Sequence, residues 1–289
     1  MGGRITFNPR FSKLPFWLCQ YNAAHWDGSA WEYIRINSTA TLYCIQYFNE
    51  DDIWVSSGYP KHWDGNNWTH FDLSDYGLEI APGYACWGTS SSDMYFVGFE
   101  GSIVHYNGSE FIEMDSGTDV HLRNIDGTDD GEHVFVVGRD INYPSPCVIL
   151  EYSNNNWETL YYIEGSLSER GKAYSVGVIQ DTVYFYMTTG LWKYNYVDNM
   201  WLNIPYEIAP FESAAFTSIT IHSYNDIFWG GAGFKYGHYN GNSYIFDRSI
   251  MDMFSSRSCN NSDYNGSIAV MVGQMFGYQH AMVARGYHQ

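Results

Sequence analysis

The sequence has 289 residues, of which 45% are hydrophobic and 19% aromatic, enough apolar material for a sizeable core and too much for a disordered chain. Its 14 Lys and Arg residues stand against 32 Asp and Glu, which gives a formal net charge of −18. Nucleic acids and anionic membranes both require a basic face, so this balance excludes them as partners. Cations, neutral sugars and basic protein surfaces remain as possible partners.

The chain contains no run of 18 apolar residues, so no membrane-inserted helix is expected. The first ten residues, MGGRITFNPR, have no apolar stretch, so no signal peptide is visible in this chain. The cysteines form no CxxC pair and their odd number rules out complete pairing, so we expect buried thiols in strands. They are Cys19, Cys44, Cys86, Cys147 and Cys259.

A seven-residue pattern recurs along the chain: His, aromatic, Asp or Asn, Gly, two polar residues, aromatic. Asp-Gly and Asn-Gly supply the positive φ angles of a tight turn, and the flanking aromatics suit paired strands. Each copy therefore predicts a β-hairpin. Close copies occupy 25–31, 62–68, 105–111 and 238–244, and degenerate copies occupy 151–157 and 193–201.

The first aromatic of each copy falls at positions 26, 63, 106, 152, 194 and 239, so the repeat is 37 to 46 residues long. One repeat, at 41–78, is expected to hold strands at 42–46, 53–55, 61–63 and 68–73. The second of these strands recurs as a short β-branched or aromatic run at 94–98, 134–138, 183–185, 227–230 and 269–273. Four strands in a period of this length predict a β-propeller.

The chain ends determine the expected number of blades. Residues 5–26 align without a gap on 42–63, so the first blade is expected to begin at the N-terminus. Residues 269–273 and 282–287 supply the second and third strands of a seventh unit, after which the sequence stops. We therefore expect one all-β domain over 1–289: a seven-bladed propeller of four-stranded antiparallel blades, with a three-stranded last blade. Six blades plus a hairpin is the alternative.

These blades resemble a broad class of bacterial β-propeller repeat proteins, whose repeat runs apolar-Trp-x-Val-Gly-x-x-Gly-x-Ile-x-His-Tyr-Asp-Gly-x-x-Trp. The nearest copy in this sequence is MYFVGFEGSIVHYNGSEF at 94–111. The resemblance implies a scaffold and binding role rather than a reaction, and a secreted or cell-surface location. Seven-bladed lectins with tryptophan-rich repeats are a further relative on pattern alone.

The repeated histidines, His25, His62, His105 and His238, are interpreted as structural, stacked or hydrogen-bonded between strands. Equivalent positions in different blades point around the ring and cannot converge on one ion with bonds of about 2.0–2.1 Å. The repeated tryptophans are interpreted as cross-strand partners. Stacking of partly exposed rings on sugars is their alternative role.

Acidic residues gather in the turns between first and second strands. The segment 126–132 has carboxylates at 126, 129 and 130, which does not match the alternating order of an EF-hand loop. Asp52, Asp93 and Asp226 occupy the same turn in other repeats and are expected to accept backbone N–H bonds. No cofactor or metal is predicted, with weak calcium binding as the alternative.

Residues that recur in every copy serve the structure of the blade, so residues that depart from the repeat are the candidates for a functional role. Loops between second and third strands, and between blades, emerge on one face of a propeller, and aromatics there suit recognition of sugars or peptides. The inter-blade connections near 76–84, 207–213 and 251–257 belong to the same rim. The candidate ligand-binding residues are Tyr59, Phe99, Arg139, Asn142, Tyr143, Phe234, Tyr236, Phe276 and Tyr278.

No GxSxG, HExxH, GxGxxG or P-loop motif occurs, and no catalytic residue is assigned. The first hypothesis is a non-enzymatic module that binds carbohydrate or protein through its aromatic loop face. A glycan hydrolase or lyase with carboxylates at the central channel is the second. The third is a structural subunit of a surface assembly, which accepts a strand from another chain at the open edge of its last blade.

Overall fold

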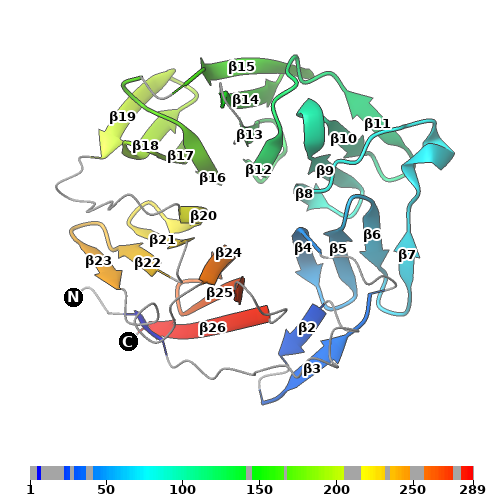
Figure 1. Cartoon of the computed structure of the whole chain (residues 1–289), viewed down its shortest axis with the longest axis horizontal. Coiled ribbons are helices and arrows are strands. Elements are labelled where there is room, and N and C mark those ends of the chain that lie inside the picture. Colours follow the sequence, from blue (N-terminus) through cyan, green and yellow to red (C-terminus); the bar gives the residue numbers. More distant parts are fainter. Residues whose placement is uncertain are drawn as a thin grey trace. The chain divides into compact units, whose positions relative to one another are not determined.

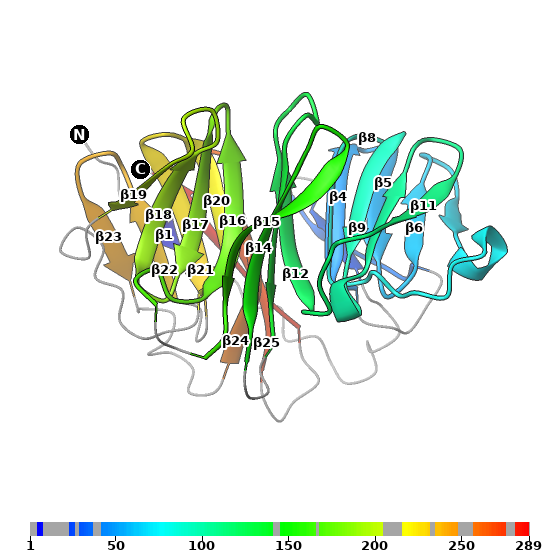
Figure 2. The same cartoon turned by 90° about the horizontal axis from the view of Figure 1, so that it is seen from above.

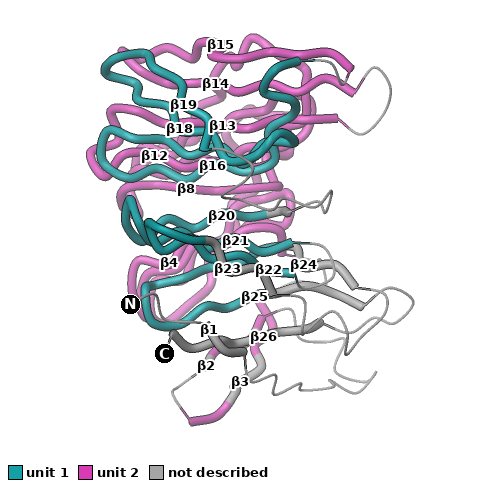
Figure 3. The backbone as a smooth tube through the Cα atoms, turned by 90° about the vertical axis from the view of Figure 1, so that its left-hand side faces the viewer, with its two compact units in different colours: residues 1–17, 167–289 teal, residues 18–166 magenta. Residues whose placement is uncertain are grey.

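The computed structural model divides the chain into two compact units (Figure 3). One comprises Leu18–Ser166, and the other comprises Met1–Trp17 together with Leu167–Gln289. A single domain over 1–289 stays a prediction. The structure describes residues 5–7, 23–26, 29–36, 42–140, 145–165, 168–204, 216–231, 235–247, 257–275 and 281–288.

The unit formed by residues 18–166 contains a two-stranded sheet and three four-stranded antiparallel sheets, each with its strands in chain order (Figure 1). This confirms the four-stranded antiparallel blades. The short sheet pairs β2 (Ala23–Trp26) with β3 (Trp31–Ile34). The blades are β4 (Cys44–Asn49), β5 (Asp52–Ser56), β6 (Pro60–Trp63) and β7 (Trp68–His70); β8 (Ala85–Ser90), β9 (Asp93–Val97), β10 (Ile103–Tyr106) and β11 (Phe111–Met114); and β12 (Leu122–Gly127), β13 (Val134–Arg139), β14 (Cys147–Ser153) and β15 (Asn156–Ile163).

The other unit contains three further four-stranded antiparallel sheets, in which the strands lie side by side (Figure 2). Its strands are β16 (Ala173–Ile179), β17 (Thr182–Met187), β18 (Gly190–Asn195) and β19 (Met200–Ile204); β20 (Phe216–Ser223), β21 (Asp226–Gly231), β22 (Lys235–Tyr239) and β23 (Tyr244–Asp247); and β24 (Arg257–Tyr264), β25 (Ile268–Met275), β26 (Ala281–His288) and β1 (Ile5–Phe7).

The last sheet corrects the prediction of a three-stranded final blade. Its order is β1-β26-β25-β24, and Ile5, Thr6 and Phe7 pair antiparallel with His288, Tyr287 and Gly286. The N-terminal strand therefore completes the C-terminal blade and does not begin the first one, as the gapless alignment of 5–26 had suggested. The physical reason is that β26 has an edge of unpaired N–H and C=O groups, which a strand from any part of the chain can satisfy.

The recurrent hairpin is confirmed, with a loop of four residues rather than two. Trp63 pairs with Trp68, and the carboxylate of Asp64 accepts hydrogen bonds from the backbone N–H groups of Asn66 and Asn67 at 2.8 and 2.7 Å. Gly65 adopts a φ of 86°, which few other residues tolerate. In the Asp-Gly or Asn-Gly pair, the Asp or Asn side chain thus accepts hydrogen bonds from two backbone N–H groups, and the Gly adopts the left-handed conformation that the turn needs.

The aromatics on either side of these turns contact each other across the strands, as predicted. Centroid separations are 5.6 Å for Trp63–Trp68, 4.6 Å for Tyr106–Phe111, 5.2 Å for Tyr152–Trp157 and 4.8 Å for Tyr194–Trp201. Each such pair stabilises its sheet by roughly 0.2–1 kcal/mol. Their periodicity therefore needs no ligand to explain it.

The core of each unit lies between neighbouring blades. One cluster joins β8–β11 to β12–β15 through residues such as Tyr95 and Trp157, and another joins β4–β7 to β8–β11 through Trp54 and Phe96. In the other unit, Tyr184 and Trp229 join β16–β19 to β20–β23. First strands contact each other in sequence, β4 with β8 and β8 with β12.

Three of the repeated histidines form pairs with the acidic residues that begin the second strands. His62 Nε2 lies 2.9 Å from Asp52 Oδ1, His105 Nε2 lies 2.7 Å from Asp93 Oδ1, and His238 Nε2 lies 2.5 Å from Asp226 Oδ1. The imidazoles of His62 and His105 also stack on Trp54 and Tyr95 at 4.5 and 4.3 Å. The structural interpretation is confirmed for His62, His105 and His238, and stays a prediction for His25.

Asp52, Asp93 and Asp226 were expected to accept backbone N–H bonds, whereas in the structure their carboxylates bind a histidine side chain of the third strand. The hydrogen bond from His105 lowers the pKa of Asp93 below its usual range, and the Thr89 hydroxyl adds to this effect at 2.5 Å. Asp52 is shared with the next blade, whose Ser91 hydroxyl also donates to it. The pairs therefore link strands within a blade and, at Asp52, link two blades.

The blade β12–β15 carries the same pair with its members exchanged. His133 precedes the second strand, where other blades have Asp, and Glu151 occupies the third-strand position of the histidine. His133 Nδ1 lies 3.0 Å from Glu151 Oε1. Four blades thus place an acid and an imidazole at these two positions, in either order.

Exchange of the two residues gives a direct test of the pairing between His133 and Glu151. The variant Glu151→His places imidazole against imidazole and should lower the free energy of unfolding by about 1–3 kcal/mol. Adding His133→Asp restores the order found in the other blades and should bring the value to within about 1 kcal/mol of the natural chain. Urea unfolding measures both. A double variant no more stable than Glu151→His would contradict the pairing.

Candidate functional site

The loops at one end of the blades in residues 18–166 are held together by glycines that touch backbone to backbone. A Cβ added to Gly83 would lie 2.5 Å from the backbone nitrogen of Gly58, and one added to Gly98 would lie 2.6 Å from that of Gly83. Gly58 and Gly98 begin second-to-third-strand connections, while Gly83 lies just before β8. Only glycine permits this approach, so three successive loops form one packed layer.

Five side chains gather on these loops, and we call them the aromatic cluster: Tyr43, Tyr84, Phe99, His121 and Arg123. Tyr84 is at their centre. Its ring lies 4.4 Å from Phe99, 5.8 Å edge-on from Tyr43 and 6.4 Å from His121, and the guanidinium of Arg123 lies over it at 4.8 Å. Phe99 also meets His121 edge-on at 5.4 Å. The cluster thus draws on three adjacent blades.

Two residues of the aromatic cluster, Tyr43 and Phe99, are substantially exposed to solvent. Tyr43 is 53% exposed and Phe99 is 44% exposed, while Tyr84, His121 and Arg123 are partly buried. Large apolar side chains seldom remain this exposed together unless they serve recognition. The arrangement offers flat ring faces beside one cationic group.

Backbone hydrogen bonds hold the cluster rigidly. Phe99 begins the 3-10 turn η3 (Phe99–Gly101), in which Glu100 has a φ of 51°, a left-handed conformation that costs energy for a residue with a side chain. The Glu100 N–H donates to His121 Nδ1 at 2.9 Å, and the His121 N–H donates to Asp140 Oδ1 at 3.1 Å. This network fixes Phe99 and His121 relative to each other.

Arg123 is oriented by the blade it belongs to. Its Nε donates to the backbone carbonyl of Arg139 at 2.9 Å, and the Arg139 N–H donates to the carbonyl of His121 at 2.9 Å. The guanidinium therefore lies over the Tyr84 ring.

Three of the predicted ligand-binding residues fall in or beside this region. Phe99 belongs to the aromatic cluster, and Arg139 supports Arg123 through its backbone. Tyr59 is 41% exposed and contacts His70 at 5.9 Å. It follows Gly58, whose backbone touches Gly83, so it lies next to the cluster without a ring contact to it.

Tyr236 was wrongly placed on an exposed loop. It is the second residue of β22, 1% exposed, and it stacks on Phe228 with 5.8 Å between centroids. The predicted loop was 234–236, but the strand begins at Lys235, two residues earlier than expected, and strand alternation turns the Tyr236 ring into the core. We therefore leave Tyr236 out of the site. The remaining candidates, Asn142, Tyr143, Phe234, Phe276 and Tyr278, lie outside the described residues.

Four members of the aromatic cluster were not predicted: Tyr43, Tyr84, His121 and Arg123. Tyr84 lay within an inter-blade connection that the sequence had marked as part of the rim. The other three sit at or just before first strands, and no local pattern distinguishes them. Their proximity arises from the packing of first strands in successive blades.

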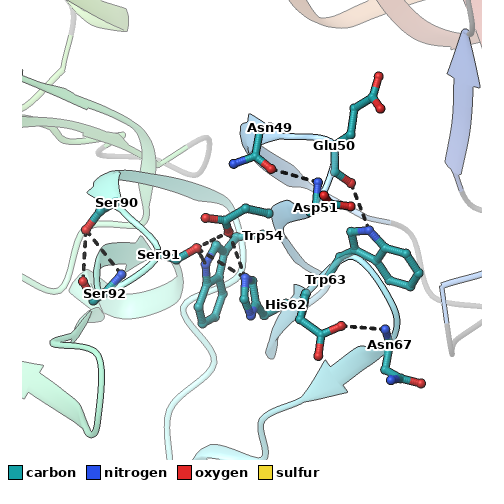
Figure 4. Close-up of polar contacts among 12 residues, drawn as sticks. Asn49, Glu50, Asp51, Trp54, His62, Trp63, Asn67, Ser90, Ser91 and Ser92 are labelled. Atoms are coloured by element: carbon teal, nitrogen blue, oxygen red, sulfur yellow. Dashed lines mark hydrogen bonds and ion pairs between the residues drawn. The ribbon is translucent and has the colours of Figure 1, made fainter.

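The polar residues at the β4–β5 and β8–β9 turns include a serine, a histidine and an aspartate in contact (Figure 4). The Ser91 hydroxyl lies 3.3 Å from His62 Nε2, and the same Nε2 lies 2.9 Å from Asp52. A hydrolytic triad needs the acid on the opposite ring nitrogen from the serine, so that the imidazole can accept the hydroxyl proton. This arrangement therefore links two blades and does not activate Ser91.

The acidic segment 126–132 begins in β12, which ends at Gly127, and its remaining residues lie in the predicted turn before β13. Asp126 accepts a hydrogen bond from the Gly127 N–H at 2.9 Å, and Asp130 accepts from the Thr128 hydroxyl at 2.6 Å and from the Glu132 N–H at 3.0 Å. Among the residues that the structure describes, no group of three or more His, Cys, Asp and Glu side chains is placed to hold a metal ion. Within the same residues, no helix has the length and apolar character needed to cross a membrane.

Comparison with known proteins relates the chain to others by structure alone. No family model and no curated protein matches its sequence. YCF48 bound to D1 peptide is similar over 100% of this chain and 97% of that one, with a TM-score of 0.67 and 13% identity. YCF48 from Cyanidioschyzon merolae is similar over 90% of this chain and 86% of that one, with a TM-score of 0.61 and 11% identity. The C-terminal WD40 domain of Sif2 is similar over 88% of this chain and 72% of that one, with a TM-score of 0.56 and 11% identity.

These likenesses, together with the repeated four-stranded sheets, establish the fold. The chain is an all-β, β-propeller repeat protein with four-stranded antiparallel blades. At 11–13% identity, the similarity extends to the fold and no further.

Proposed function

We propose that this protein is a non-enzymatic binding module that takes a segment of another protein on the aromatic cluster. The observation that carries the proposal is the meeting of Tyr43, Tyr84, Phe99 and Arg123 from adjacent blades, with Tyr43 53% and Phe99 44% exposed. Tyrosine and arginine are enriched among the residues that dominate protein interfaces. Rings held by a rigid scaffold lose little conformational entropy on binding.

The charge of the chain narrows the class of partner. With a net charge of −18, the protein repels acidic segments and attracts neutral or basic ones. Two acidic residues border the cluster: Glu100 follows Phe99, and the Asp140 carboxylate accepts a hydrogen bond from the His121 N–H. A peptide with apolar or aromatic anchors and at least one Lys or Arg therefore fits best.

The similar structure of YCF48 is described as bound to D1 peptide, which supports a peptide ligand for this fold. Carbohydrate is the second ligand class, favoured by the flat exposed faces of Tyr43 and Phe99, on which a sugar ring can stack. We also propose that the protein is secreted or lies at the cell surface. We further propose that it has seven blades: the six four-stranded sheets and one more blade that contains the β2–β3 hairpin.

The other two hypotheses have less support. The structural-subunit hypothesis relied on an open edge in a three-stranded last blade, and β1 occupies that edge. The glycan hydrolase or lyase hypothesis relied on carboxylates at a central channel. No contact among the described residues favours it over binding.

The test is a selection from a random peptide library, followed by affinity measurement on variants. The changes Phe99→Ser and Tyr84→Ser should each weaken the binding of the selected peptides by about 2 kcal/mol, which is on the order of a thirtyfold increase in Kd. Tyr162→Ser is the matched control, since Tyr162 is 50% exposed in the same unit but lies on β15. Peptides that bind Phe99→Ser and Tyr84→Ser as tightly as the natural chain would refute the site. A glycan array run in parallel separates the two ligand classes.

A further inference from the structure

The first strand of one blade carries a line of exposed apolar side chains, which we call the β4 row: Tyr43, Ile45 and Tyr47. They are 53%, 63% and 56% exposed. The Tyr43 N–H donates to the Ser56 carbonyl at 2.9 Å, so the contact of β4 with β5 extends back to this residue. Because side chains of a strand alternate between its two faces, the three members of the β4 row lie on the same face.

The exposure of the β4 row is not a general property of first strands. Cys44 and Phe48, on the opposite face of β4, pack against the core between β4–β7 and β8–β11. The first strands β8, β12 and β16 have no exposed large hydrophobic side chain. Contiguous exposed apolar surface of this kind marks interaction sites in soluble proteins. The β4 row also continues the aromatic cluster, because Tyr43 belongs to both and meets Tyr84 edge-on at 5.8 Å.

The geometry of β4 favours an extended ligand. Alternate residues of a strand are about 6.6–6.8 Å apart, which is also the spacing of alternate residues in an extended peptide. In the sheet order β4-β5-β6-β7, β4 pairs with β5 on one side, and no other strand in the described part of the chain pairs with it. A strand with one unpaired side offers backbone N–H and C=O groups to an extended segment.

The far end of the β4 row is acidic. Glu50 and Asp51 lie in the turn that follows β4, and both are exposed. In Figure 4 the Glu50 carboxylate points away from the side chains drawn beside it. Within the residues that the structure describes, neither carboxylate forms an ion pair. A ligand that follows the β4 row away from the aromatic cluster therefore reaches two carboxylates, which complement a basic side chain.

We propose that the partner segment binds in an extended conformation along β4, with apolar side chains at alternate positions on the β4 row and a Lys or Arg beside Glu50 and Asp51. From Tyr43 to the end of β4 at Asn49 the strand spans about 20 Å, at about 3.3 Å per residue, so the segment has about seven residues. This inference rests on the proposed function and adds to it the conformation, spacing and charge pattern of the ligand.

The test takes the tightest-binding peptide selected from the random library and measures its Kd on variants of the full chain by fluorescence anisotropy. Ile45→Ser and Tyr47→Ser should each raise Kd on the order of tenfold, because each removes an apolar contact from the interface. Ile112→Ser is the matched control, since Ile112 is 44% exposed in the same unit but lies on β11, and it should leave Kd unchanged. Thermal unfolding establishes that the variants fold.

Two further measurements test the spacing and the charge. A peptide of the same composition, with its apolar residues moved from alternate to consecutive positions, should bind on the order of tenfold more weakly. Glu50→Lys should raise the Kd of the selected peptide severalfold and reduce its dependence on salt concentration. Glu113→Lys makes the same charge change at an exposed position on β11 and should have a smaller effect.

The outcomes separate this inference from the proposed function. If Phe99→Ser weakens binding while Ile45→Ser and Tyr47→Ser bind as tightly as the natural chain, the aromatic cluster stands and the extended binding mode is overturned. If none of the three weakens binding, the proposed function fails together with this inference. A rearranged peptide that binds as tightly as the selected one would also overturn the extended mode.

Discussion

Replacing Trp54 by alanine is expected to lower the free energy of unfolding by about 3–5 kcal/mol, the range typical of a large aromatic removed from a core. Trp54 is 1% exposed and stacks on His62 at 4.5 Å and on Phe71 at 5.5 Å. Its indole N–H donates to Ser91 of the next blade at 3.0 Å. The substitution therefore removes a ring that holds both its own blade and the boundary with its neighbour.

Trp63→Ala is the matched control for this prediction, since Trp63 belongs to the same blade but lies beside the hairpin turn. Its ring is partly exposed, pairs with Trp68 and donates to the carbonyl of Glu50 at 3.0 Å. Its loss should cost about 1 kcal/mol. Chemical unfolding of both variants measures the difference. Equal destabilisation would show that the blade boundary is not the stabilising element.

Removing residues 1–7 is expected to destabilise the last blade and to promote self-association. The deletion takes away β1, whose three residues pair with β26. Each backbone hydrogen bond lost costs about 1 kcal/mol net. The deletion also leaves β26 with an unpaired edge, which other chains can extend. Thermal unfolding and light scattering measure the two effects.

A peptide with the sequence of the first eight residues provides the control. Added to the shortened chain, it should restore the melting temperature and suppress association, because it can pair with β26 in the register that β1 uses. A peptide of the same composition in scrambled order should do neither. If the shortened chain were as stable and as monomeric as the full chain, the assignment of β1 to the last blade would be wrong.

The repeat was predictable because its signals are local. Asp64 and Gly65 determine a turn by their own side chain and backbone, and second strands such as Met94–Val97 are continuous apolar runs. Such features depend on residues within a few positions of each other. The four-stranded blades and their hairpins therefore followed from the sequence.

Pairings between distant residues were not predictable from such patterns. His105 and Asp93 were each recognised as recurrent, but their contact depends on the register of β9 and β10. The pattern of 5–7 matched a first strand, but it could not specify that the partner is β26. Tyr84 and His121 likewise meet only because β8 and β12 belong to adjacent blades. The binding site is made of such non-local contacts, so most of it was missed.

The most direct test of the aromatic cluster is hydrogen exchange on the protein with and without a selected peptide. We expect slower exchange on binding at 84–85, 99–102 and 121–123, the backbone around Tyr84, Phe99, His121 and Arg123, where the cluster is held by hydrogen bonds such as Gly101 N–H to the Val120 carbonyl. The hairpin turn at 64–67 should exchange at an unchanged rate. Protection confined to other segments, with 84–85, 99–102 and 121–123 unaffected, would contradict the assignment of the binding site.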